Sequence, residues 1–329
     1  MRHPIDPTVD CVFKALFGAE ANRDLLIHFL NAVLAADLSA PITAVELLNP
    51  YNEREFLDDK LSVVDVKARD DAGRLYQIEI QLLVLPDLPA RILYGWADLY
   101  SAQLQSGEDY GDLRPCWSIW LLGETLRAAV DGYAHRLRMQ DDQGRALLDH
   151  GGIWLLELGK FAAVHRGSDA IDSELTRWLK FFTEGERLDP AALPDWMQTP
   201  EMRHAMSTLT AFSDKEREYH AYQARMNYLR QQRSIQRRIE ELEAGEQAAA
   251  ITLAEARAVA ERERLDKEAA LVAEEQARAA AERERVDKEA ALVAEEQARA
   301  VAERERLDKE AALAEVERLR RLLESRQES

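Results

Sequence analysis

The sequence predicts an α/β fold of the α+β type, with a mixed β-sheet core flanked by helices and a long α-helical tail at the C-terminus. Three observations lead to this prediction. Strand-forming runs bounded by turn residues are interleaved with segments of helical periodicity over the first two hundred residues. From about residue 214 the composition changes to Glu, Arg, Ala and Gln, which favour helix. The chain of 329 residues, 47% of them hydrophobic, is long enough to bury one full core with residues left over.

Two helices open the predicted fold. Apolar residues recur at helical spacing over residues 7–36, and the pattern is interrupted near Gly18. A strand is expected over residues 42–48. Two further runs rich in strand formers, 61–69 and 75–82, are separated by turn residues and therefore predict a β-hairpin.

The remaining elements complete a larger sheet. Residues 89–105 carry one apolar stripe at helical spacing, and residues 117–122 form an apolar run typical of a strand buried on both faces. The order up to this strand is α-β-β-β-α-β. A second pair of strands (133–139 and 152–158) and two helices (172–183 and 202–212) are expected to follow.

A pair of carboxylates on the hairpin is the feature that points to chemistry. If the turn is centred on Ala72, Asp65 lies opposite Glu79, and residues directly opposite on antiparallel strands have Cβ atoms roughly 4.5–5.5 Å apart. Because side chains alternate between the two faces of a strand, Lys67 and Gln81 join the same face.

Two interpretations of this pair remain open. Like charges opposite each other destabilise a sheet unless a cation or a proton relieves them, and Mg²⁺ prefers carboxylate oxygens with several water positions left free. Asp65 and Glu79 therefore suggest a metal site. The alternative is an ordinary solvated strand face, since a slip of one residue in register would place the two carboxylates on opposite faces.

Several short motifs occur in an order that resembles one nuclease family. Together they are similar to the recombination-promoting nuclease/transposase family of the PD-(D/E)XK nuclease superfamily, and the resemblance extends over roughly residues 5–245. The motifs are Asp10 to Gly18, Leu48-Asn49-Pro50, Asp65-Val66-Lys67 with Gly73 following, Glu79-Ile80-Gln81, Arg91 to Tyr100, Gln103 to Tyr110, and Leu155 to Phe161 with Glu157 and Lys160.

The resemblance implies a metal-dependent DNA endonuclease with a PD-(D/E)XK nuclease-like core, linked to recombination and mobile elements in bacteria. It implies that Asp65 and Glu79 are ligands of Mg²⁺ or Mn²⁺ and that Asp10, an early acidic position, completes the site. Gln81 occupies the position of the superfamily's lysine. Because an amide carries no positive charge, we infer that Lys67, on the same face, supplies it.

Charge bears on the expected affinity for DNA. The net charge is −18, and residues 1–213 hold 20 basic and 33 acidic side chains, a balance of −13. A DNA-binding protein normally carries a basic patch, so we expect weak DNA affinity or help from a partner. The basic residues expected near the hairpin are Lys60, Lys67, Arg69, Arg74 and Arg91.

Other sequence features bear on the cellular location and on the role of the cysteines. The chain has no run of about 18 apolar residues and does not begin like a signal peptide, so we expect a cytoplasmic protein without a membrane partner. Cys11 and Cys116 are far apart in sequence and form neither a disulfide framework nor a zinc pattern.

The C-terminal part contains a repeat. We expect a nuclease-like domain over 1–213, a helical extension over 214–245 and a repetitive long helix over 246–329, in which the segment that begins at Ala256 recurs after 21 residues. One heptad position is apolar, but its companion three residues later holds Glu, which gives at best a weak coiled-coil seam. Charge pairs at i,i+4 support an isolated helix: Glu263–Lys267, Glu284–Lys288 and Glu305–Lys309. The repeat is therefore either a spacer or an element for homo-oligomerisation.

Two functions compete at this point. An endonuclease explains why both carboxylates are present at the spacing that the hairpin needs. A catalytically inactive nuclease-fold scaffold, acting through its C-terminal helix, fits the acidic surface better. A filament-like structural protein rests on the repeat alone and leaves the first two hundred residues unexplained.

Overall fold

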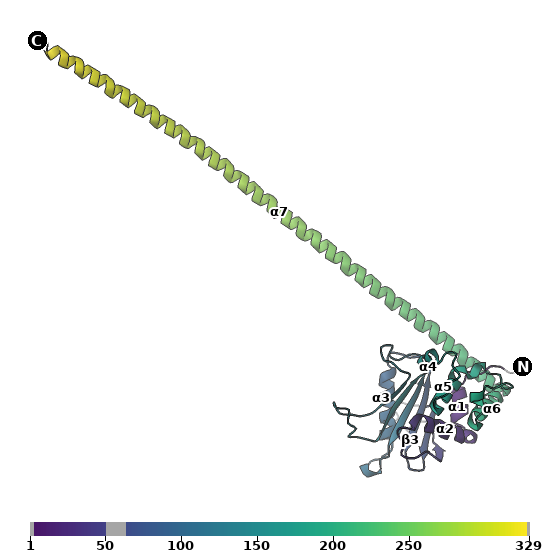
Figure 1. Cartoon of the computed structure of the whole chain (residues 1–329). Helices are drawn as coiled ribbons and strands as arrows, with labels where there is room; N and C mark the ends of the chain where they lie inside the picture. The colour runs from purple at the N-terminus through teal and green to yellow at the C-terminus, as the bar shows by residue number, and fades with distance from the viewer. Residues whose placement is uncertain (1–2, 51–63, 328–329) are drawn as a thin grey trace. The chain divides into compact units, whose positions relative to one another are not determined.

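The computed structural model describes residues 3–50 and 64–327. Its central feature is a six-stranded sheet in the order β1-β2-β3-β4-β6-β5 (Figure 1). The strands are β1 (Val45–Leu47), β2 (Val66–Asp70), β3 (Leu75–Gln81), β4 (Cys116–Leu122), β5 (Ala134–Leu137) and β6 (Gly151–Glu157).

The sheet is mixed, as the sequence predicts. β3, β4 and β6 run parallel in the centre, where every residue of β4 and β6 is buried. β1 and β2 extend one side antiparallel, and β5 closes the other side antiparallel to β6. The predicted order α-β-β-β-α-β and the second strand pair are confirmed, although most strands are shorter than expected.

Helices cover both faces of the sheet (Figure 1). They are α1 (Asp10–Phe17), α2 (Arg23–Leu34), α3 (Leu88–Ser101), α4 (Leu158–Val164), α5 (Glu174–Glu184), α6 (Pro200–Asp214) and α7 (Glu216–Gln327). The main core lies between one face and α1, α2, α5 and α6, while smaller apolar clusters join the other face to α3. The short helix α4 is not expected from the sequence, which extends the preceding strand to Leu158.

Asp70 holds the β2–β3 hairpin. Its Oδ1 accepts the backbone N–H groups of Ala72 at 3.0 Å and Arg74 at 2.9 Å. Its Oδ2 accepts from the Arg74 side chain at 2.5 Å and from the Tyr76 hydroxyl at 2.8 Å. Gly73 has φ of +77°, a left-handed conformation that glycine adopts without strain. One buried carboxylate thus fixes the turn and, through it, the register of the two strands.

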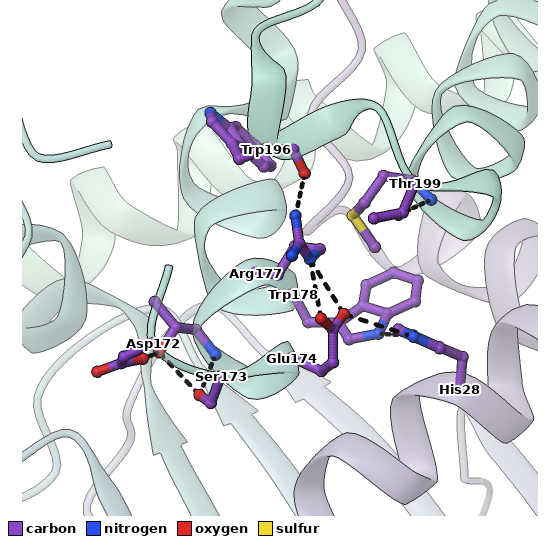
Figure 2. A network of polar contacts seen from close by, with 10 residues as sticks. His28, Asp172, Ser173, Glu174, Arg177, Trp178, Trp196 and Thr199 are labelled. Atoms are coloured by element: carbon purple, nitrogen blue, oxygen red, sulfur yellow. Dashed lines mark hydrogen bonds and ion pairs between the residues drawn. The ribbon is translucent and has the colours of Figure 1, made fainter. Parts of the chain in front are cut away.

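A second polar network ties α5 to α2 (Figure 2). The indole N–H of Trp178 donates to Nδ1 of His28 at 2.9 Å, so the proton of this imidazole is on Nε2, which faces the Glu174 carboxylate at 3.5 Å. Arg177 contacts the same carboxylate at 3.0 Å and donates to the carbonyl of Trp196 at 2.5 Å. These contacts make a cross-linked helical layer, and α1 packs against α2 and α6 in that layer.

The chain divides into two compact units, residues 1–237 and 238–329. The beginning of α7 belongs to the first unit, because Tyr222 and Leu229 are buried and Tyr219 and Met226 pack against the main core. The expected segment boundaries at 213 and 245 stay a prediction.

The second unit is helical and its side chains are exposed wherever the structure describes them. Ion pairs recur with the 21-residue period, joining Arg264 to Glu261, Arg285 to Glu282 and Arg306 to Glu303. The expected pair Glu284–Lys288 forms at 2.7 Å, whereas its equivalents in the other two copies do not form in the described chain. An exposed ion pair contributes little to the stability of a helix, so a charged side chain can exchange one neighbouring partner for another at a small cost in free energy. None of the described helices combines the length and apolarity needed to cross a membrane.

Candidate active site

The register of the hairpin sets the two carboxylates against each other. Val66 pairs with Ile78, so Asp65, directly before β2, lies opposite Glu79. The backbone N–H of Ile80 donates to Asp65 Oδ2 at 2.9 Å, which holds the Asp65 side chain at β3. This is the pairing that a turn centred on Ala72 predicts; residues 61–63, also expected in the strand, lie outside the described residues.

Glu79 is in an unfavourable place for a charge. Its side chain is buried, and burial, followed by the negative charge of Asp65, raises the pKa of the Glu79 carboxyl well above its usual range. A hydrogen bond between the two carboxyl groups acts in the same direction, while the positive charges of Arg91 and Lys14 oppose it. Glu79 therefore retains a proton, or needs a cation, over a range of pH in which an ordinary glutamate is ionised.

Lys14 reaches the carboxylate pair from the other helical layer. Its ammonium lies 3.2 Å from Asp65 Oδ1, the oxygen that does not accept from Ile80. Lys14 is on α1, whose apolar side chains Val12, Phe13, Leu16 and Phe17 are fully buried.

Gln77 lies beside Glu79 on the same face of β3. It is 1% exposed, and its amide nitrogen donates to Glu79 Oε1 at 3.3 Å. Its amide oxygen is buried and has no hydrogen-bond partner among the described residues. Gly95 of α3 makes room for this side chain, because a Cβ there would lie 3.0 Å from the Gln77 nitrogen.

The other expected site residues lie at different distances from this pair. Lys67 pairs with Gln77 across the hairpin and Gln81 ends β3, so both share the face of the carboxylates, as alternation predicts. Asp10 does not join them. Its Oδ1 contacts Arg225 of α7 at 3.0 Å and accepts the N–H of Cys11, and the described residues contain no group of three acidic, His or Cys side chains placed to hold a metal ion.

The expected basic surface is partly neutralised. Arg74 is committed to the buried carboxylate of Asp70, and Arg69 lies 3.8 Å from Glu46. Lys60 is outside the described residues.

Comparison with known proteins places the chain in a family. A model of PD-(D/E)XK nuclease family transposases matches residues 7–238, from just before α1 into the first part of α7. The chain belongs to this family. No curated protein and no solved structure gives a significant match. The family model covers the sheet, its helices and the carboxylate pair, and it leaves out the 21-residue repeat.

The residues of this PD-(D/E)XK family member fit a hard divalent cation. PD-(D/E)XK nucleases typically use divalent metal ions. Asp65 and Glu79 offer carboxylate oxygens, and the adjacent Gln77 amide oxygen is a buried acceptor without a partner. A cation at this point would relieve the repulsion that raises the pKa of Glu79. Asp65 and Glu79 are the groups that would hold it.

Sequence reasoning misses two residues of this site. Gln77 is two positions before Glu79 on a strand, so alternation alone places it on the carboxylate face. Lys14 is on a different element, and no local pattern connects it to Asp65.

Proposed function

We propose that this protein is a Mg²⁺-dependent DNA endonuclease, with Mn²⁺ as an alternative metal, and that it acts in recombination or in the movement of mobile elements. The observation that carries the proposal is the position of Asp65 opposite a buried Glu79 whose pKa is raised. Two facing carboxylates destabilise a sheet unless a cation or a proton relieves their repulsion, and a divalent cation bound between them would do so. Membership in a nuclease family supports the same conclusion.

The reaction is hydrolysis of a phosphodiester. The oxygen of a water molecule forms a bond to phosphorus, and the bond from phosphorus to one sugar oxygen breaks. The attacking water gives a proton to solvent, and the departing oxygen takes one from solvent. A bound Mg²⁺ lowers the pKa of a coordinated water and stabilises negative charge on the phosphate.

The chain's own groups orient these participants. Asp65 and Glu79 would hold the metal. The backbone N–H of Ile80 donates to Asp65, and the Gln77 amide nitrogen donates to Glu79. Gln81 and Lys67 share the face and are proposed to orient the attacking water and the phosphate. Asp10, which the resemblance assigns to the metal, contacts Arg225 and is proposed to hold α1 to α7.

DNA is the proposed partner, and its binding is expected to be weak. The globular part is acidic, and two of the arginines expected near the hairpin form ion pairs with carboxylates. Because DNA binding by basic residues weakens with salt, cleavage is expected to fall as the salt concentration rises.

The proposal is tested with plasmid DNA and the purified full-length chain in Mg²⁺, Mn²⁺, Ca²⁺ or EDTA. Asp65→Asn is the sharpest variant, because the amide oxygen still accepts from Ile80 while the charge is lost. We expect cleavage in Mg²⁺ or Mn²⁺, none in EDTA, and a loss of about 100-fold or more in Asp65→Asn.

Asp71→Asn is the matched control, since Asp71 is an exposed acid in the hairpin turn. This variant should cleave like the wild type. Cleavage that survives Asp65→Asn and Asp65→Ala would assign the activity to another site or to a contaminant.

The alternative function is a catalytically inactive scaffold with the same fold. The acidic surface and the neutralised arginines favour it. It predicts no cleavage with any metal, and interaction with partner proteins, or with a second copy of the chain, through residues of α7.

A further inference from the structure

The proposed site has no positive charge on β3. Gln81 stands two residues after Glu79, where the family name itself calls for lysine, and its amide is neutral. Phosphate hydrolysis builds negative charge on the phosphate oxygens, so a cation near the carboxylate pair lowers the barrier. The inference that follows rests on the proposed function.

The positive charges of Arg91 on α3 and Lys14 on α1 both act on Glu79, that of Arg91 more strongly, but it is Lys14 that forms an ion pair with Asp65. Among the described residues, the ion pair formed by Asp65 is with Lys14, at 3.2 Å. The charge of Lys14 also acts on Glu79, so its ammonium lies close enough to affect both carboxylates.

The backbone position of Lys14 is fixed, whereas its ammonium is free to move. Val12, Phe13, Leu16 and Phe17 anchor α1 in the core at 0% exposure. The Lys14 side chain is 44% exposed, so its flexible stem can turn without disturbing the packing.

The geometry makes Lys14 a competitor of a metal ion. Asp65 has one oxygen bonded to the Ile80 N–H, and its other oxygen, Oδ1, faces the Lys14 ammonium. A divalent cation held by Asp65 and Glu79 would compete with the ammonium for the Asp65 carboxylate and would repel it. A displaced ammonium would remain beside the site, where a phosphate group of bound DNA could accept a charge-assisted hydrogen bond from it.

Lys67 is less well placed for this role. It lies two residues along β2 from Asp65, a distance of about 7 Å along the strand, and opposite Gln77 instead of a carboxylate.

We propose that Lys14 of α1 takes the place of the absent strand lysine: it neutralises Asp65 in the metal-free protein and contacts the scissile phosphate when metal and DNA are bound. The lysine of the site is thus supplied by a helix from the opposite face of the sheet.

The test uses the full-length chain with Lys14→Met, Lys14→Arg and, for the competing candidate lysine, Lys67→Met. Three quantities are measured: Mn²⁺ affinity by calorimetry without DNA, affinity for a short DNA duplex in Ca²⁺ by fluorescence anisotropy, and plasmid cleavage in Mg²⁺. Circular dichroism shows whether each variant is folded.

We expect opposite effects on metal and on DNA. Lys14→Met should bind Mn²⁺ several-fold more tightly, because a competing positive charge is gone. The same variant should bind the duplex more weakly and cleave about 10- to 100-fold more slowly. Lys14→Arg should recover part of the duplex affinity and part of the cleavage rate. Lys67→Met should lower both quantities less than Lys14→Met does.

Several results would overturn the inference. Unchanged duplex binding and cleavage in Lys14→Met would show that the ammonium does not contact phosphate. A larger loss in Lys67→Met would assign the charge to Lys67. Weaker Mn²⁺ binding in Lys14→Met would make Lys14 a structural support of Asp65.

The same measurements distinguish a failure of the endonuclease proposal from a failure of the inference about Lys14. If the wild type neither binds Mn²⁺ nor cleaves DNA, the endonuclease proposal falls and this inference falls with it. If the wild type binds Mn²⁺ and cleaves while Lys14→Met matches it in both, the inference alone is wrong.

Discussion

Glu79, a proposed metal ligand, shows most directly how one buried residue can lower the stability of the metal-free protein. Its carboxyl is buried beside Asp65, and both burial and that negative charge raise its pKa. In the unfolded chain Glu79 titrates near 4.3. Between that value and the folded pKa, the folded state binds the proton more strongly, so the contribution of Glu79 to stability is full below about pH 4.3 and is lost as the pH rises through the folded pKa.

Glu79→Gln should therefore stabilise the metal-free protein at neutral pH. The amide keeps the shape of the side chain and cannot ionise. We expect its free energy of unfolding to exceed that of the wild type at pH 7, and the difference to shrink toward pH 4. Urea unfolding in EDTA across this range measures it. Mg²⁺ should raise the stability of the wild type and leave Glu79→Gln nearly unchanged; curves that stay parallel at all pH values would contradict this account of Glu79.

The sequence predicts the facing of Asp65 and Glu79 because both lie on one hairpin, where strand alternation and a single turn determine which residues meet. It does not predict the contact with Lys14 or the pairing of Asp10 with Arg225 of α7, which are 215 residues apart. Such contacts depend on how helices pack on a sheet, and periodicity within a segment contains no information about that.

At the scale of elements, Asp70 links turn chemistry to the site. Its carboxylate accepts two backbone N–H groups of the turn and the buried hydroxyl of Tyr76. A shift of one residue in this hairpin would separate Asp65 from Glu79. The hydrogen bonds of Asp70 therefore matter for the site as well as for the turn, because they fix the register that brings Asp65 opposite Glu79.

Asp70→Ala should destabilise the hairpin. The change leaves the Tyr76 hydroxyl without its partner and removes the acceptor of the turn, with an expected cost of about 1–3 kcal/mol in the free energy of unfolding. Urea unfolding measures it, and Asp71→Ala, in the adjacent exposed position, should change stability by less than 0.5 kcal/mol or so. Equal effects of the two substitutions would show that Asp70 does not hold the register.

Most of the elements follow from the sequence because their apolar patterns are strong. The run 117–122 matches β4. The expected interruption near Gly18 is also found, because α1 ends at Phe17 and α2 begins at Arg23. Element ends are less well predicted: the strand expected over 42–48 contracts to Val45–Leu47. The helix α4 has only seven residues, too few for periodicity to separate it from the end of β6.

The whole molecule combines a unit with a packed core and a helical unit with exposed side chains. Every large apolar residue from Ile235 to Leu319 for which the structure gives an exposure is at least 43% exposed, and the ion pairs of the repeat join residues of the same helix. The companions of the apolar heptad position are Glu268, Glu275 and Glu282. A second helix packed along this seam would have to bury their charges, so pairing is expected to be weak.

Truncation after Gly245 should leave a folded protein with nearly unchanged cleavage per molecule. It keeps the whole first unit, residues 1–237, including the buried Tyr222 and Leu229. The removed repeat has no apolar face that belongs to the core. Circular dichroism and plasmid cleavage measure both expectations, and a loss of folding would assign the repeat a structural role that its exposure does not suggest.

Sedimentation decides between a spacer and a self-association element. If the repeat is a spacer, the full-length chain and the truncated chain have the same association state. If the repeat self-associates, the full-length chain forms the larger species, and its association strengthens as the pH falls and the seam carboxylates lose charge. Deletion of one copy, residues 277–297, preserves the heptad register and should then weaken association without abolishing it. A tight dimer that is independent of pH and mediated by residues 256–313 would contradict the weak-seam account, because it would require partners for the glutamates that this helix alone does not provide.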